Sequence, residues 1–165
     1  MARIFRAKEN REPKWLAGIA PFPGDINDKV MRILVMDDYR SHGESLAEFL
    51  AAKGHEALYA ETYAEAQWLI DLIRFDFALL DFDMPGMSGP RVAQGLAKRL
   101  PNIQSVIMSA KTPSGVRLAE LGGLRFLQKP VYTSALLDIL GQLERDMAGL
   151  ALVQRPSFSL VKYIK

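Results

Sequence analysis

Short apolar runs recur along the chain, and most of them end in a polar or charged residue. The run Phe77–Leu80 leads directly into Asp81 and is followed by Pro-Gly and Ser-Gly turn signals. It is too short for a free-standing helix, and its continuous apolar character is typical of a strand buried in a parallel sheet. On this pattern, strands are predicted at residues 31–36, 56–60, 77–81, 103–108 and 124–128.

Segments with apolar residues at helical spacing alternate with these strands. In the first segment Leu46, Phe49 and Leu50 share one face, and Gly54 provides a C-terminal cap. Alternating strands and helices favour an α/β fold in which helices cover both faces of one parallel sheet. Helices are predicted at residues 41–53, 62–73, 89–100 and 133–147, with a short, irregular one between residues 113 and 121.

Polar residues stand at the ends of four predicted strands. Because the carboxyl ends of parallel strands meet at one edge of the sheet, these residues are expected to converge there. Carboxylates that are forced together need a cation, and oxygen donors without a nearby His or Cys select a hard ion such as Mg²⁺ or Mn²⁺. The polar residues at the four strand ends are Asp37 and Asp38, Asp81, Ser109 and Lys129; Ala110 follows Ser109, and Pro130 follows Lys129.

Together with the run Met84–Gly89 after Asp81, this ordered series resembles the receiver domain of two-component response regulators. The resemblance extends over about residues 31–147 and is closest to stand-alone, chemotaxis-type receivers. It implies a doubly wound, five-stranded parallel sheet with the flavodoxin-like strand order 2-1-3-4-5. The chain then divides into a basic N-terminal extension (residues 1–30), a receiver domain (residues 31–148) and a C-terminal tail (residues 149–165).

The resemblance also implies a role for each residue at the sheet edge. Asp81 would be the phosphoacceptor, and the donor would be a phosphohistidine on a sensor histidine kinase or a phosphotransfer protein. The phosphoryl oxygens would be bound by Ser109, Ala110 and Lys129. The expected ligands of the metal ion are Asp37, Asp38, Asp81 and the backbone carbonyl of Asp83.

In such a domain, phosphorylation is expected to switch the conformation through Ser109 and Phe126. Ser109 keeps the hydroxyl of the commoner Thr, whereas Phe126 lacks the hydroxyl of a Tyr, so its part of the switch would depend on packing. The signal would appear on the face made by the fourth helix, fifth strand and fifth helix. That face could contact an unknown downstream protein or pair two copies as a homodimer. Because the segment between Ser109 and Phe126 is shorter than usual in the family, the output surface is expected to differ.

Two further residues are expected to flank the phosphoryl group. Asp83 lies two residues after Asp81, and Lys111 lies two residues after Ser109. An ion pair between Asp83 and Lys111 is predicted to cover part of the acyl phosphate and to slow attack by water.

The composition excludes several other functions. The 165 residues include no cysteine, which excludes disulfides, thiolate catalysis and zinc–thiolate sites. No apolar run is long enough to span a bilayer and no secretory signal is found, so a cytoplasmic protein without membrane insertion is expected. Residues 149–165 are too few for a DNA-binding domain, so direct DNA binding is not expected. The two histidines, His42 and His55, are interpreted as isolated surface residues without partners at ligand spacing.

Two other functions remain open from the residues alone. The sequence Leu79–Asp83 also resembles the Asp-x-Asp motif of haloacid-dehalogenase-like phosphatases, in which Asp81 would be the nucleophile and Asp83 the general acid. That family normally places its acidic pair downstream of this motif, whereas here Asp37 and Asp38 precede it. The second alternative is a receiver fold that takes no phosphoryl group and acts as an adaptor. A receiver protein that catalyses only its own phosphorylation and dephosphorylation is favoured over both.

Overall fold

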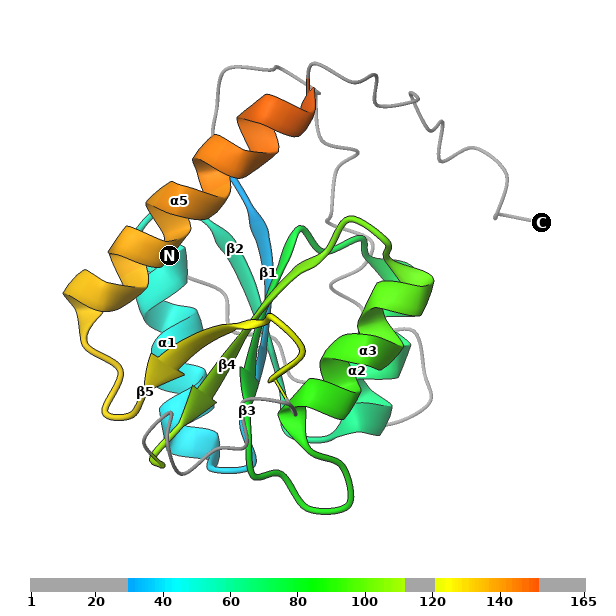
Figure 1. The fold of residues 1–165 in the computed structure, drawn as a ribbon. Helices are drawn as coiled ribbons and strands as arrows, with labels where there is room; N and C mark the ends of the chain where they lie inside the picture. Colours follow the sequence, from blue (N-terminus) through cyan, green and yellow to red (C-terminus); the bar gives the residue numbers. More distant parts are fainter. Residues whose placement is uncertain (1–29, 112–120, 152–165) are drawn as a thin grey trace, which may run out of the picture.

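Strands and helices alternate along the part of the chain that the computed structural model describes, residues 30–111 and 121–151 (Figure 1). The strands are β1 (Arg32–Met36), β2 (Glu56–Ala60), β3 (Phe77–Asp81), β4 (Gln104–Ser109) and β5 (Arg125–Gln128). The helices are α1 (Arg40–Ala52), α2 (Tyr63–Leu72), α3 (Gly89–Arg99) and α5 (Thr133–Ala151). The helix predicted between residues 113 and 121 lies almost wholly outside the described residues, as do most of the two terminal segments.

The five strands form one sheet in the order β2-β1-β3-β4-β5, and all neighbouring pairs are parallel. The predicted α/β class and the predicted strand order are therefore confirmed. β3 lies at the centre, and all five of its residues are buried. This position explains why its sequence is a continuous apolar run that ends in a single acidic residue.

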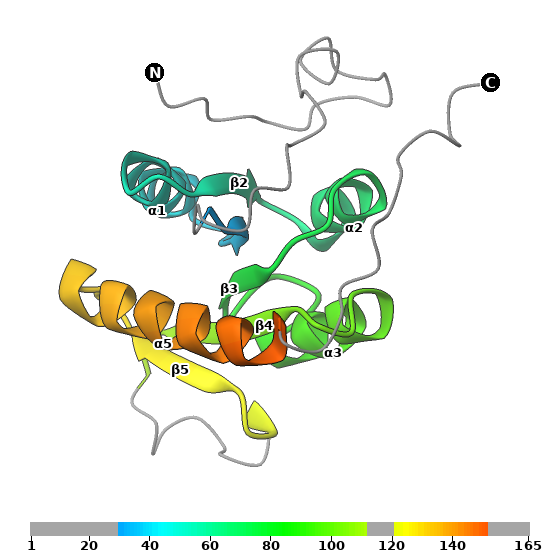
Figure 2. The ribbon, with the colours of Figure 1, turned by 90° about the horizontal axis from the view of Figure 1, so that it is seen from above.

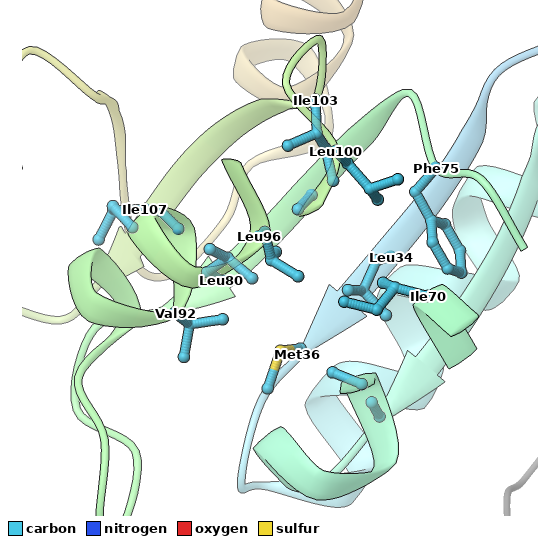
Figure 3. Close-up of a cluster of buried hydrophobic side chains, with 14 of the residues drawn as sticks. Leu34, Met36, Ile70, Phe75, Leu80, Val92, Leu96, Leu100, Ile103 and Ile107 are labelled. Atoms are coloured by element: carbon cyan, nitrogen blue, oxygen red, sulfur yellow. The ribbon is translucent and has the colours of Figure 1, made fainter. Parts of the chain in front are cut away.

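Helices cover both faces of the sheet. Figure 2 shows α1 and α5 on one face and α2 and α3 on the other. Successive strand residues point to opposite faces, so Leu34 and Leu80 pack toward α2 and α3, while Val35 and Leu79 pack toward α1 and α5. Figure 3 shows the first of these clusters, in which Leu96 of α3 lies beside Leu80. Each fully buried aliphatic side chain contributes about 1.5–3 kcal/mol, so these two apolar layers hold the helices on the sheet.

None of the described helices combines the length and the apolar character that crossing a membrane requires.

The turn between β3 and α3 is shaped by glycines. Gly86 adopts a φ of 80°, and the backbone N–H of Gly89 donates to the carbonyl oxygen of Phe82 over 3.0 Å. A Cβ atom on Gly89 would lie 2.4 Å from the backbone oxygen of Asp81, which is closer than any side chain can approach. The start of α3 therefore packs directly on the backbone of Asp81, and only glycine fits there.

We predict that Gly89→Ala destabilises the protein by about 1–3 kcal/mol, because the new methyl group displaces the backbone of Asp81 or of α3. Gly141→Ala in α5 is the matched control, since the nearest group to its new Cβ is the flexible end of Arg145 at 3.5 Å. That change should instead stabilise the protein by about 1 kcal/mol, the difference in helix propensity. Urea unfolding of both variants measures the two effects, and equal stabilities would contradict the close packing at Gly89.

Candidate functional site

Four polar side chains come together where the strands end. Asp37 directly follows β1, Asp81 ends β3, Ser109 ends β4, and Lys129 directly follows β5. Asp37 is 0% exposed, Asp81 is 6% exposed and Ser109 is 1% exposed. Buried polar groups need partners inside the protein, so their contacts define the site.

Lys129 joins the two buried carboxylates. Its Nζ atom lies 2.6 Å from Oδ1 of Asp81 and 2.8 Å from Oδ2 of Asp37. Both contacts are short, charge-assisted interactions with buried carboxylates, while the Lys129 side chain is 20% exposed. The ends of the first, third and fifth strands thus meet around one ammonium group.

The pocket shifts the ionisation of its members. Burial raises the pKa of the Asp81 carboxyl; the hydrogen bond and charge of Lys129 oppose this shift, and the charges of Asp37 and Asp38 add to it. For Lys129, burial acts to lower the pKa, but the contacts with Asp37 and Asp81 raise it overall. Lys129 therefore remains a cation, and the Asp81 carboxylate is more basic than an exposed one.

Asp37 has three further contacts. The backbone N–H of Tyr39 donates to its Oδ1 over 3.0 Å, and Nδ1 of His42 lies 2.6 Å from its Oδ2. The hydroxyl of Tyr59 donates to its backbone oxygen over 2.8 Å. The interpretation of His42 as an isolated surface residue is therefore wrong, because the first turn of α1 carries its ring back over Asp37.

Tyr59 is a site residue that the sequence did not reveal. It comes from β2 and is buried, and burial raises the pKa of its hydroxyl. A Cβ atom on Gly43 of α1 would lie 2.2 Å from the Tyr59 ring, so a glycine at this position leaves room for the aromatic side chain. The sequence does contain a signal for this contact: Gly43 lies inside a predicted helix and Tyr59 inside a predicted strand. A glycine there leaves room for a large neighbour, and a buried tyrosine hydroxyl usually has a hydrogen-bond partner.

Ser109 and the residues after it complete the edge of the sheet. The hydroxyl of Ser109 accepts a hydrogen bond of 3.1 Å from the backbone N–H of Lys111, and its carbonyl oxygen accepts one of 2.7 Å from the backbone N–H of Lys129. Asp81 pairs with Met108 in the sheet register, so Ser109 lies one residue beyond the end of β3. Ala110 is exposed next to it.

The ion pair expected between Asp83 and Lys111 is present, with Nζ of Lys111 3.0 Å from Oδ1 of Asp83. Both side chains are more than half exposed, so water screens the pair. The backbone N–H of Asp83 donates to Oδ2 of Asp81 over 3.1 Å, and Lys111 also lies 5.7 Å from the centre of the Phe82 ring. The pair therefore stands beside Asp81, at the mouth of the buried pocket.

The donor set suits a hard cation, because Asp37 and Asp81 supply only oxygen atoms and already bind one cationic group. Asp38, however, is exposed and faces a cleft of about 230 Å³ whose lining includes Glu61 and Met84. Within residues 30–111 and 121–151, no three histidine or acidic side chains lie together at metal-binding spacing. Of the predicted metal ligands, Asp37 and Asp81 lie together with Lys129 between them, whereas Asp38 points to solvent. The metal site therefore stays a prediction.

Phe126 lies apart from this pocket. It pairs with Ile107 in the register of β4 and β5, and it packs half-buried against the cluster under α2 and α3. A second cleft, of about 510 Å³, opens beside Lys129. Its lining consists of Tyr39, His42, Ala110, Lys129, Pro130 and Val131.

Residues 33–141 match the response regulator receiver domain family. The chain is 35% identical over 132 residues to the sensory/regulatory protein RpfC of Xanthomonas campestris, an alignment that covers 73% of this chain and 18% of RpfC. It is also 35% identical over 110 residues to a response regulator receiver protein of Anaeromyxobacter sp., covering 66% of this chain and 46% of that protein. The chain thus spans less than half the length of these relatives.

Solved structures show the same fold. A CheY-like receiver domain protein from Methanospirillum hungatei superimposes with a TM-score of 0.66 at 22% identity, covering 73% of this chain and 98% of that one. The response regulator TrrA from Thermotoga maritima, in complex with Mg²⁺-BeF, gives a TM-score of 0.61 at 27% identity over 69% of this chain and 99% of that one. None of these similarities supports the haloacid-dehalogenase-like alternative.

We predict that Tyr59→Phe destabilises the protein by about 1–2 kcal/mol, because it leaves the buried carbonyl oxygen of Asp37 without its hydrogen bond. Tyr39→Phe is the control, since Tyr39 is 70% exposed, and it should change stability by less than about 0.5 kcal/mol. Urea unfolding gives both values. If the two variants are equally stable, the Tyr59 hydroxyl does not support the loop that holds Asp37.

Proposed function

Because this chain belongs to the response regulator receiver domain family of two-component signalling, we propose that the Asp81 carboxylate accepts a phosphoryl group and thereby switches the domain. The main support is the contact of Lys129 with both Asp81 and Asp37 at the carboxyl edge of the sheet. A buried carboxylate with a raised pKa beside a fixed cation suits attack on phosphorus, since phosphoryl transfer depends on positioning and charge neutralisation.

The proposed donor is a phosphohistidine on a sensor histidine kinase or a phosphotransfer protein. Receiver domains in general interact with sensor histidine kinases, and one curated relative of this chain is the sensor histidine kinase AruS of Pseudomonas aeruginosa. An oxygen of Asp81 attacks phosphorus, the new O–P bond forms, and the P–N bond to the imidazole breaks. The imidazole leaves with the electron pair of that bond and takes a proton from solvent.

Each neighbour of Asp81 has a proposed task in this transfer. Lys129 and the Ser109 hydroxyl bind phosphoryl oxygens, together with the backbone N–H of Ala110. Receiver domains in general bind Mg²⁺, and such an ion would neutralise further charge on the phosphoryl oxygens. In this chain, Asp37, Asp38, Asp81 and the backbone carbonyl of Asp83 would hold Mg²⁺ or Mn²⁺.

The phosphoryl group would then change the positions of Ser109 and Phe126. The Ser109 hydroxyl accepts a hydrogen bond from the backbone N–H of Lys111, so a shift of this hydroxyl would be passed to the segment that begins at Lys111. Phe126 is half-buried on the next strand and could move by repacking. The proposed output is a change on the β5–α5 side of the domain that a downstream protein, or a second copy of this chain, recognises in the cytoplasm.

We predict that Asp81→Asn abolishes phosphoryl incorporation. The wild-type protein is incubated with Mg²⁺ and phosphoramidate, a small donor that shares the P–N bond of phosphohistidine, and intact-protein mass spectrometry measures the added group. The amide cannot attack phosphorus as a carboxylate does, so the signal should fall to background.

Asp83→Asn is the matched control, because it keeps a carboxylate at residue 81 and should still be phosphorylated. Removing Mg²⁺ with a chelator should lower incorporation in the wild-type protein. Incorporation that persists in Asp81→Asn would refute the assignment of the acceptor. A wild-type protein that takes up no phosphoryl group would favour the adaptor alternative.

We further predict that the Asp83–Lys111 pair slows hydrolysis of the acyl phosphate. Replacing both residues with Ala should increase the rate of dephosphorylation by roughly fivefold or less, the scale of an exposed ion pair. The rate is measured by mass spectrometry after the donor is removed.

The matched control replaces Arg32 and Glu56 with Ala. These two residues form a partly exposed ion pair where β1 and β2 begin, at the end of the strands opposite to the site. Its loss should leave the dephosphorylation rate unchanged. An unchanged lifetime in the Asp83→Ala, Lys111→Ala variant would refute this shielding role.

A further inference from the structure

His42 holds the Asp37 carboxylate from the side of α1. Its Nδ1 atom lies 2.6 Å from Oδ2 of Asp37. A carboxylate only accepts hydrogen bonds, so Nδ1 carries the hydrogen and donates it. The backbone N–H of Tyr39, the residue before α1, donates to the other oxygen, Oδ1, over 3.0 Å. Each oxygen of this buried carboxylate is therefore bonded by a donor from the start of α1.

The packing of α1 on the sheet fixes the place of His42. The next residue, Gly43, lies against the ring of Tyr59, and a Cβ atom on it would be only 2.2 Å from that ring. The hydroxyl of the same ring donates to the backbone oxygen of Asp37 over 2.8 Å. One buried aromatic side chain thus contacts both the helix that carries His42 and the residue that His42 bonds.

Lys129 bonds the same oxygen as His42, but this bond can be given up. Its Nζ atom lies 2.8 Å from Oδ2 of Asp37 and 2.6 Å from Oδ1 of Asp81, at the end of a flexible side chain. Under the proposed function both carboxylates bind a metal ion, which then compensates the charge of Asp37 in place of the ammonium group. His42 and the Tyr39 N–H each use one of the two lone pairs on their oxygen, so both bonds are compatible with a bound ion.

We infer that His42 is a positioning residue of the proposed metal site, which holds the Asp37 carboxylate in the orientation that binding of Mg²⁺ or Mn²⁺ requires. The inference rests on the proposed function, in which Asp37 is a metal ligand. Hydrogen bonds from neighbouring groups orient the carboxylates that bind metals, and losing such a group weakens binding by about 10–100-fold. Without His42, only the N–H of Tyr39 would restrain rotation of the carboxylate about its Cβ–Cγ bond once Lys129 has left it.

A direct bond from the imidazole to the metal ion is the other role that His42 could have. Against it, Nδ1 is already used by the hydrogen bond to Asp37. Among residues 30–111 and 121–151, His42 also belongs to no group of three histidine or acidic side chains at metal-binding spacing. The two roles predict different metal preferences. An imidazole ligand favours Ni²⁺ over Mg²⁺, whereas a group that only orients Asp37 affects both ions alike.

The test measures metal binding to the unphosphorylated protein, so no phosphoryl donor is needed. Electron paramagnetic resonance measures free Mn²⁺ directly, and Mg²⁺ and Ni²⁺ are measured by competition with it. His42→Leu should weaken binding of all three ions by about tenfold, the lower end of the loss expected for an orienting residue. His42→Asn should bind them nearly as well as wild type, because its amide nitrogen can occupy the position of Nδ1 and donate to Asp37.

His55→Leu is the matched control and should leave all three affinities unchanged. This second histidine directly precedes β2, at the opposite end of the strands, and its Nδ1 accepts a hydrogen bond from the backbone N–H of Met31 over 3.4 Å. Urea unfolding without metal shows that each variant is folded. His42→Ala replaces the Leu variant if the latter does not fold.

The outcomes separate this inference from the proposed function. A wild-type protein that binds neither Mn²⁺ nor Mg²⁺ would refute the metal site of the proposed function, and the role of His42 with it. If the wild-type protein binds both ions and His42→Leu binds them equally well, only the role of His42 is refuted. The same holds if His42→Asn is as weak as His42→Leu, since a donor to Asp37 would then not matter. A loss much larger for Ni²⁺ than for Mg²⁺ would make His42 a ligand and overturn its positioning role.

Discussion

Two buried carboxylates at one edge of the sheet are the constraint on which the rest of the structure depends. Asp37 and Asp81 have almost no contact with water, so the protein itself must compensate their charges. Lys129 compensates both carboxylates. It directly follows β5, which begins about fifty residues after the start of β3. The register of the strands must be correct, because a slip of one residue would turn Asp81 to the opposite face.

The apolar layers supply this register, and small residues allow the close contacts around it. The strand residues alternate between the two helix-covered faces, so the position of each strand is set by the packing of both layers. Gly89 lets α3 start directly on the backbone of Asp81, and Gly43 makes room for the ring of Tyr59, whose hydroxyl holds the backbone of Asp37. The site is therefore built by the packing of the sheet and helices together.

The fold and the convergence of the strand ends could be predicted because both follow from position along the chain. A short apolar run that ends in an acid or a lysine shows where a strand stops, and parallel topology brings those ends together. The partner of His42 could not be predicted in this way, since it depends on the direction in which α1 leaves the acidic pair. Asp38 shows the same limit: it is the sequence neighbour of Asp37, yet the chain turns between them and leaves one carboxylate exposed and the other buried.

Exposed and buried ion pairs differ in how much free energy their rearrangement involves when a new charge is added nearby. An exposed pair such as Asp83–Lys111 is worth about 0–1 kcal/mol, because water and salt screen both groups. Removing one partner of a buried pair costs about 3–5 kcal/mol, because the remaining charge then has neither its partner nor water to compensate it. Under the proposed function, a phosphoryl group on Asp81 therefore acts on the conformation through its largely buried neighbours Lys129 and Ser109, and not through the exposed pair. The exposed pair can alter the access of water to the phosphoryl group, but it has too little energy to reset the fold around it.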